Sequence, residues 1–332
     1  MPSPVRLRGL RHRLLRPSTL ALVGLNLLLY FLLFRWAGEN IQASRLAEYF
    51  RQIPVWAILG SLLINFLALA LYGVRMALLL RRDFHTAFFI INIGYALNTL
   101  IPLRMGEGIK LFLSHKMFAV PLTGIFAASV AEKMIDLVKI LVLGSAIVLF
   151  AAGEAIQVSA MLSIFAIVLL AAGVVVLFRR NVVRIVKLVP RGSRWRRASI
   201  DLHKHANEYP VVRIVAATAG IGILNIALVY FTFNTYLPGL RIGIVEAIAL
   251  LVVVALAIAI PSAPAGLGLF EAGIVAFLTQ KSNVGNEAAL AAASVFHLVI
   301  TLPQLVMTAW LMWGRDRILS KAKIDDRRTD PL

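Results

Sequence analysis

The fold is decided by residues 245–278, which read VEAIALLVVVALAIAIPSAPAGLGLFEAGIVAFL. The apolar run Val245–Ile260 stops at the proline- and glycine-containing segment Pro261–Gly268, and a short apolar segment, Leu269–Leu278, follows it. A transmembrane helix needs about 20 mostly apolar residues, so this region does not fit a simple span. Its two prolines and two glycines free backbone amides and carbonyls, which in lipid must find partners or water. We therefore expect a helix that breaks inside a membrane, with a cavity at the break.

A second region is interrupted in a similar way. The segment Phe84–Leu103 is apolar but contains Asn92, Asn98 and Pro102, and the polar stretch Arg104–Lys116 follows it. Both regions contain Ile-Pro and then a glutamate near glycines. The two motifs are Ile101-Pro102 … Gly106-Glu107-Gly108 and Ile260-Pro261 … Gly268 … Glu271 … Gly273.

The composition of the whole chain places both regions in a membrane protein. Of the 332 residues, 60% are hydrophobic and 15% are charged, whereas soluble proteins carry about 25% charged residues. Together with the long apolar runs, this excludes a soluble enzyme, a disordered chain and a disulfide scaffold. The chain has no cysteine, which excludes thiolate metal sites, iron–sulfur clusters and thiol catalysis. We expect no cofactor.

Six further segments are candidates for full membrane spans. They are Leu20–Phe34, Val55–Leu80, a span within Phe118–Phe150, Val158–Phe178, Ile214–Leu237 and Ala288–Trp313. The run 118–150 would be roughly 50 Å long as one helix, so it either projects into the cytoplasm or breaks near Pro121 and Gly124.

The distribution of Lys and Arg predicts the orientation. These residues concentrate in the N-terminus 1–19, at Arg81-Arg82, in the loop 179–213 and in the tail 316–332. Basic segments stay on the cytoplasmic side, so all four are expected there, including both termini. The loop 179–213 lacks a recognisable nucleic-acid module, and attraction to anionic lipid headgroups accounts for its charge. We expect no nucleic-acid partner.

This orientation is consistent only if the two interrupted regions return to the side from which they enter. Phe84–Lys116 should dip in from the cytoplasm, and Gly243–Leu278 should dip in from outside. We therefore predict an all-α polytopic membrane protein with one transmembrane domain, residues 20–315, containing six full spans and two re-entrant hairpins. Spans 55–80 and 118–150 with the first hairpin, and spans 214–237 and 288–313 with the second, would form an inverted repeat of the kind typical of secondary transporters.

Charged groups at membrane depth are costly and usually face a partner or a wet cavity. Arg104, Glu107 and Lys110 share one helix face because they are spaced by three residues. One interpretation is a solvated cytoplasmic turn with ordinary ion pairs. The other is a cationic binding site for a lipid phosphate, in which Glu107 positions Arg104.

A second charged group lies on the helix expected within 118–150. Glu132 and Asp136 are four residues apart and share a face, with Lys139 three residues further on. In the membrane they would need a cationic partner such as Arg75 or Arg104, or would carry protons. Alternatively, they lie on a cytoplasmic extension of the helix, where a charged side chain costs little free energy because water solvates it.

Two more ionisable groups belong to the second half of the chain. Glu271 comes at the start of a half-helix, where a carboxylate caps the positive end of the helix dipole, and it is also a candidate headgroup or proton site. His297 lies about ten residues into the last span. It is either a packed, hydrogen-bonded residue or a proton relay.

Three motifs in this order resemble one known family. They are Pro102-Leu-Arg104-Met-Gly106-Glu107-Gly-Ile-Lys110, Ala128-Ser129-Val-Ala-Glu132-Lys133-Met-Ile-Asp136 and Pro261-Ser-Ala-Pro264-Ala-Gly266-Leu-Gly268-Leu-Phe270-Glu271-Ala272. Over roughly residues 15–315, the chain resembles the transmembrane flippase domain of the lysylphosphatidylglycerol synthetase family. Where that family often has Arg after Glu in the second motif, this chain has Lys133, and it has Ala265 where a glycine often follows the proline.

The resemblance implies lipid translocation and not lipid aminoacylation, because this chain leaves no room before Leu332 for a soluble transfer domain. It implies a bacterial inner-membrane location and membrane lipids with a polar or anionic headgroup as partners. It also implies a set of residues near a central cavity. These are Arg104, Glu107, Lys110, Glu132, Asp136, Pro264, Gly266 and Glu271, with Gly268 in the same break.

From these features we expect a lipid flippase and not an enzyme, with Glu271 or His297 as candidates for proton coupling. One alternative is an intramembrane lipid-modifying enzyme that uses the acid pairs as bases or as metal ligands. Another is an accessory protein of lipid or glycolipid synthesis that does not transport. Gly220, Gly222 and Gly243 would allow close helix contacts within one chain or in a homo-oligomer.

Overall fold

In this computed structural model, the described residues are 35, 39, 41–101, 106–151, 210–237, 239–259, 266–282 and 284–313. All regular elements in these ranges are α-helices. They are α3 (Ala43–Gln52), α4 (Val55–Leu80), α5 (Phe84–Leu100), α6 (Gly106–Phe118), α7 (Leu122–Ala151), α10 (Val211–Tyr236), α11 (Ile244–Ala259), α12 (Leu269–Ser282) and α13 (Asn286–Trp313). The expected spans Leu20–Phe34 and Val158–Phe178 lie outside the described residues.

Within the described ranges, three helices are long and apolar enough to cross a membrane: α4, α10 and α13. The helix α7 has 30 residues, or about 45 Å, but it carries four charged residues near its middle. It begins directly after Pro121, where the break in the run 118–150 was expected, and Ala119 has a left-handed φ of 54° just before it. The helical membrane class is thus confirmed, and the total of six spans stays a prediction.

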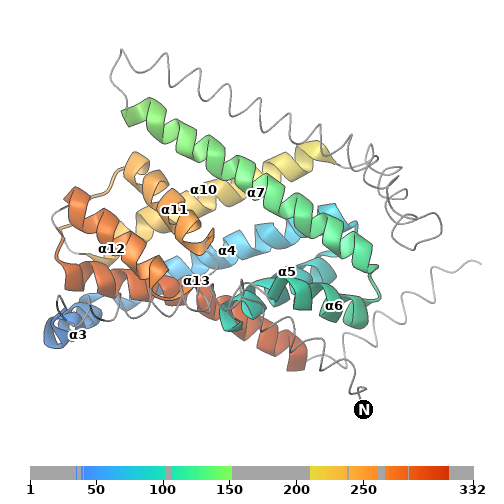
Figure 1. The fold of residues 1–332 in the computed structure, drawn as a ribbon, viewed down its shortest axis with the longest axis horizontal. Coiled ribbons are helices and arrows are strands. Elements are labelled where there is room, and N and C mark those ends of the chain that lie inside the picture. The colour runs from blue at the N-terminus through green and yellow to red at the C-terminus, as the bar shows by residue number, and fades with distance from the viewer. Residues whose placement is uncertain are drawn as a thin grey trace, which may run out of the picture.

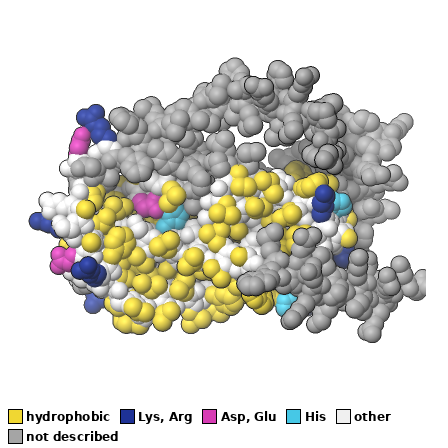
Figure 2. All heavy atoms as spheres, turned by 90° about the horizontal axis from the view of Figure 1, so that it is seen from below, with side chains coloured by type: hydrophobic (Ala, Val, Ile, Leu, Met, Phe, Trp, Pro, Cys, Tyr) yellow, Lys and Arg dark blue, Asp and Glu magenta, His cyan; other side chains and the backbone are white. Residues whose placement is uncertain are grey.

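The surface of the described helices is apolar, as contact with lipid requires. On α4 the exposed large side chains include Leu59, Leu63, Phe66 and Leu67, which recur on one helix face. Figure 2 shows hydrophobic side chains over most of the described part of one face, with Lys and Arg mainly toward its two ends.

The helices α4 and α10 pack together as an antiparallel pair through the middle of the molecule (Figure 1). Ser61 Oγ lies 3.0 Å from Thr232 Oγ1, and Tyr72 accepts a hydrogen bond of 3.2 Å from Asn225, so numbers rise along one helix as they fall along the other. Gly220 belongs to this contact, because an added Cβ there would lie 2.8 Å from a methyl carbon of Leu71. The close approach that Gly220 allows is therefore within the chain.

Four shorter helices form two hairpins. The first hairpin, α5–α6, has helices of 17 and 13 residues, and the second hairpin, α11–α12, has helices of 16 and 14. At about 20–25 Å, each helix is shorter than the roughly 30 Å hydrocarbon core. Asp83 starts α5 three residues after α4 by accepting a hydrogen bond of 2.9 Å from the Thr86 amide. Because α4 and α10 are antiparallel, the hairpins that follow them lie at opposite ends of the molecule (Figure 1).

The helix contacts have a two-fold pattern. The exchange of α4, α5, α6 and α7 for α10, α11, α12 and α13 maps the main contacting pairs among these eight helices onto one another, and the α4–α10 pair onto itself. For example, α5 packs on α13 while α11 packs on α7, so each hairpin contacts the long helix of the other unit. This is the pattern that an inverted repeat predicts, and it brings both hairpin ends to the centre.

The first hairpin closes around Gly106. An alanine Cβ at this position would lie 2.5 Å from the Asn98 backbone nitrogen and 2.6 Å from the Leu97 carbonyl carbon, and backbone atoms cannot move aside cheaply. We expect Gly106→Ala to lower the free energy of unfolding by about 1–3 kcal/mol, as overpacking does.

The matched control is Gly108→Ala in the same helix turn, because no atom lies within 4 Å of a Cβ there. This control should be neutral or stabilising by up to about 1 kcal/mol. Reversible unfolding in lipid–detergent micelles measures both changes. Equal losses in the two variants would contradict this packing of the hairpin.

Candidate functional site

A cavity of about 620 Å³ lies in the centre of the bundle. Its walls come from both repeat units, and the ends of both hairpins reach it through Asn98, Thr99 and Glu107 on one side and Ile258 and Gly266 on the other. Cavities of this size are typical of small-molecule sites. The polar residues in the lining are Asn65, Tyr72, Tyr95, Asn98, Thr99, Glu107, Lys133, Asp136, Lys139, Asn225, His297, Thr301 and Gln304.

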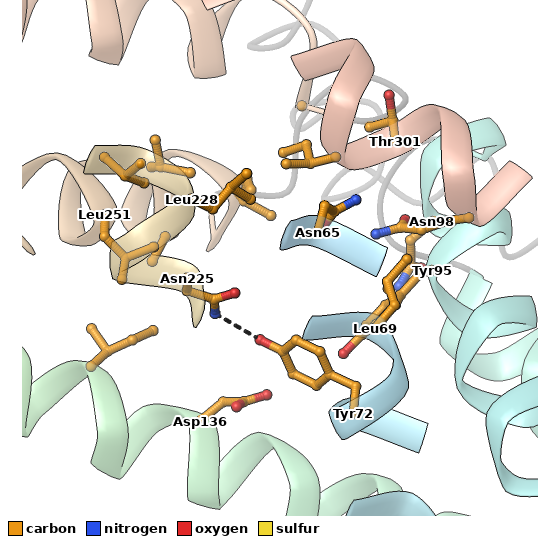
Figure 3. Close-up of a pocket in the computed structure, with 18 of the residues that line it drawn as sticks. Asn65, Leu69, Tyr72, Tyr95, Asn98, Asp136, Asn225, Leu228, Leu251 and Thr301 are labelled. Atoms are coloured by element: carbon orange, nitrogen blue, oxygen red, sulfur yellow. Dashed lines mark hydrogen bonds between the residues drawn. The ribbon is translucent and has the colours of Figure 1, made fainter. Parts of the chain in front are cut away.

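Helical spacing explains how the long helices present polar groups to this cavity. On α13, His297, Thr301 and Gln304 follow at intervals of four and three residues, which places them on one face. Asn65 and Tyr72 on α4 are seven residues apart and share a face in the same way. Figure 3 shows Asn65, Tyr72 and Thr301 around the open space, with Tyr72 pointing toward Asn225 of α10.

Glu107 is the centre of the ion pairs at the first hairpin. Its carboxylate lies 2.6 Å from Lys110 Nζ in α6 and 3.2 Å from Lys133 Nζ in α7. It also accepts a hydrogen bond of 3.3 Å from the Asn98 side chain in α5. One carboxylate thus joins three helices, which positions the end of the hairpin against α7.

Glu132 lies behind this group and is completely buried. Tyr95 donates a hydrogen bond of 3.1 Å to it, and Lys133 and Lys110 lie 3.6 and 3.9 Å away. A buried carboxylate needs such partners because desolvation of an unpaired charge is costly. Glu132 therefore lies inside the packed bundle and not on a solvated extension of the helix.

Asp136 pairs with Arg75, one of the two partners expected from the sequence. Both terminal nitrogens of Arg75 donate to the two carboxylate oxygens, at 2.9 and 3.1 Å. Lys139 donates to the same carboxylate at 3.2 Å and to the Tyr72 hydroxyl at 3.4 Å. This network ties α4 to α7 and leaves Lys139 in the wall of the cavity.

We call these seven residues the charged cluster: Arg75, Glu107, Lys110, Glu132, Lys133, Asp136 and Lys139. Four cations face three carboxylates, so the cluster has one formal positive charge in excess. Lys133 is the most accessible of its cations, with 45% of its side chain exposed, whereas Lys110 is 1% exposed. Lys133 also lines the cavity.

A second acid–base pair lies at the second hairpin. Glu271 Oε1 lies 2.6 Å from His297 Nδ1, and Glu271 Oε2 accepts a hydrogen bond of 2.7 Å from the Gly268 amide. The His297 ring stacks on Phe270 at a centroid distance of 4.2 Å. Gly266 and Gly268 have φ values of 76° and 84°, a conformation that glycine adopts without strain. Glu271 thus caps α12, as expected, and also contacts α13.

The structure brings some of the expected site residues together and separates others. Glu107, Asp136, Gly266 and His297 line the cavity. Lys110 and Glu132 are buried behind the lining. The Glu271 carboxylate contacts the His297 ring, and the Gly268 amide donates a hydrogen bond to Glu271. Arg104 and Pro264 lie outside the described residues.

Sequence reasoning did not select Lys133 and Lys139 as site residues, although both line the cavity. The signal was their position on the same helix as Glu132 and Asp136. The uncharged polar groups of α4, α10 and α13 carried no comparable signal, because single Asn and Thr residues are common in apolar helices.

The family model described as the lysylphosphatidylglycerol synthase TM region matches residues 21–307. The chain belongs to this family. Membership confirms the resemblance seen in the three motifs, and with the apolar helices it supports a multi-pass membrane protein involved in lipid handling. A search among curated proteins finds no match.

Proposed function

We propose that this protein is a flippase, which moves a lipid with a phosphate-bearing headgroup between the two leaflets of the bacterial cytoplasmic membrane. The observation that carries the proposal is a charged, partly open cavity inside a bundle whose outer surface is apolar. A headgroup in such a cavity is shielded from hydrocarbon while its acyl chains stay in lipid. Both termini would lie in the cytoplasm, as the positive-inside rule predicts.

Each part of the site has a role in this proposal. Lys133 and Lys139 would bind the phosphate, and Arg104 is a further candidate cation from its motif. Glu107, Glu132 and Asp136 hold the two lysines in place. The break with Pro264, Gly266 and Gly268 would act as the hinge of the second hairpin. Glu271 and His297 would couple movement to protons.

Transport in proteoliposomes tests the proposal. The vesicles hold purified protein and trace amounts of headgroup-labelled anionic or zwitterionic phospholipid, and an impermeant quencher reports the label that reaches the outer leaflet. We expect Lys133→Gln to lower the rate about ten- to a hundredfold, because a charge-assisted hydrogen bond contributes about 1.5–3 kcal/mol. Lys133→Arg should keep most of the rate, since it keeps the charge.

The matched control is Lys116→Gln. Lys116 is an exposed cation on α6, and its ammonium lies 4.6 Å from the Phe112 ring centroid, outside the cavity lining. Its removal should change the rate by less than twofold. Absence of transport with every lipid would contradict the flippase, and metal-dependent turnover of the lipid would then favour the enzyme.

A further inference from the structure

The two acid–base pairs that line or border the cavity occupy equivalent positions in the two repeat units. Glu107 precedes Lys133 by 26 residues, and Glu271 precedes His297 by 26. Lys133 is the twelfth residue of α7, and His297 is the twelfth residue of α13. Lys133 and His297 are therefore counterparts under the exchange of the two units.

The pairs are also equivalent in what they join. In each unit, a glutamate in the first turn of the second hairpin helix contacts a base in the long helix that follows. The Glu107–Lys133 distance is 3.2 Å and the Glu271–His297 distance is 2.6 Å. Each glutamate has a further partner in its own hairpin, Asn98 in one case and the Gly268 amide in the other. Both bases line the same cavity.

The chemistry of the two bases is shared as well. A lysine ammonium and a protonated imidazole both donate charge-assisted hydrogen bonds to phosphate oxygens. Each already contacts a carboxylate, so a phosphate that takes the same N–H donor competes with that carboxylate. Displacement of the carboxylate would free the hairpin from the long helix and so would couple headgroup binding to movement of the hairpin.

We propose that His297 is a second headgroup-phosphate site, equivalent to the site at Lys133. The phosphate would pass from Lys133 to His297 across the cavity and displace Glu107 at the first site and Glu271 at the second. This inference rests on the proposed flippase function and adds to it the second binding group and the competition with the two glutamates.

The two sites differ in their donors. A lysine ammonium has three N–H donors on one nitrogen, whereas a protonated imidazole has one on each ring nitrogen, and Nδ1 of His297 already lies 2.6 Å from Glu271. Three ionisable groups on α13 and the helices packed against it have partners of their own. Arg75 of α4 pairs with Asp136, Tyr95 of α5 donates to Glu132, and the amide of Gln42 beside α3 binds Glu287 at the start of α13. Within the described residues, Glu271 is the titratable group in contact with the His297 ring.

The experiment measures the transport rate in proteoliposomes with equal pH on both sides. We expect His297→Gln to lower the rate on the order of tenfold, because a charge-assisted hydrogen bond to the phosphate contributes about 1.5–3 kcal/mol. His297→Lys should keep the rate within about threefold of wild type, because it keeps the charge that binds the phosphate, whereas a proton relay would be lost in both variants.

His85→Gln is the matched control, because His85 is exposed at the start of α5 and does not line the cavity. It should keep the wild-type rate. A wild-type rate in His297→Gln, or an equal loss in His297→Gln and His297→Lys while both remain folded, would overturn the second site while transport itself stands. If His297→Lys does not fold, an unchanged lipid concentration for half-maximal rate in His297→Gln overturns the proposal. Absence of transport in the wild type would instead contradict the flippase function.

Discussion

Replacement of Asp136 by leucine is expected to lower the free energy of unfolding by about 3–5 kcal/mol, because it leaves a buried charge without its partner. Arg75 is completely buried, and both of its terminal nitrogens donate to this carboxylate. Arg75→Met should cost less, since Lys139 still lies 3.2 Å from Asp136. Reversible unfolding in lipid–detergent micelles measures these changes.

The double variant Arg75→Met/Asp136→Leu tests whether the loss comes from the pair. It should be more stable than Asp136→Leu alone, since it also removes the buried guanidinium that Asp136→Leu leaves without its partner. Arg82→Met is the control, because Arg82 is exposed at the end of α4, and its replacement should change stability by less than about 0.5 kcal/mol. Strictly additive losses in the double variant would contradict a coupled pair.

Replacement of Glu271 by glutamine is expected to reduce transport about tenfold or more while the protein stays folded. Glutamine can still accept the hydrogen bond from the Gly268 amide, so the cap of α12 is kept. It has no charge with which to displace a phosphate from His297, so the headgroup should leave that site slowly. The proteoliposome assay measures the rate, and thermal unfolding confirms the fold.

Glu271→Ala separates the two roles of this side chain. It should lower transport similarly and also destabilise α12 by about 1 kcal/mol, the typical value of a helix cap. The lipid concentration for half-maximal rate should fall in Glu271→Gln, because the bound phosphate no longer has a competitor. A wild-type rate in Glu271→Gln would show that the carboxylate has no part in turnover.

The fold follows from local patterns because a membrane imposes local rules. A backbone in lipid must satisfy its own hydrogen bonds, so apolar length and Pro-Gly breaks indicate where helices cross and where they stop. The span expected at Val55–Leu80 has the bounds of α4, and α10 begins three residues before the expected Ile214. The two hairpins also lie at the interrupted regions expected at Phe84–Lys116 and Gly243–Leu278. Each of their helices is shorter than a full membrane span.

The site was less predictable, because it depends on how helices turn toward one another. Spacing placed Glu107 and Lys110 on one face of α6, but it did not show which of them faces the cavity. Lys110 packs so closely on Gly94 of α5 that a Cβ there would lie 2.5 Å from Lys110 Cδ. The cation that stays accessible is Lys133 on α7, whose side chain is 45% exposed.

By itself, the sequence determined that this is a helical membrane protein with two broken regions, and it identified the acids that had to find partners, because a buried charge is costly wherever it lies. Only the tertiary structure decided the pairing of Arg75 with Asp136, 61 residues apart, and of Glu271 with His297, 26 residues apart. Such contacts depend on the packing of helices that are distant in sequence, and helical periodicity carries no information about that packing.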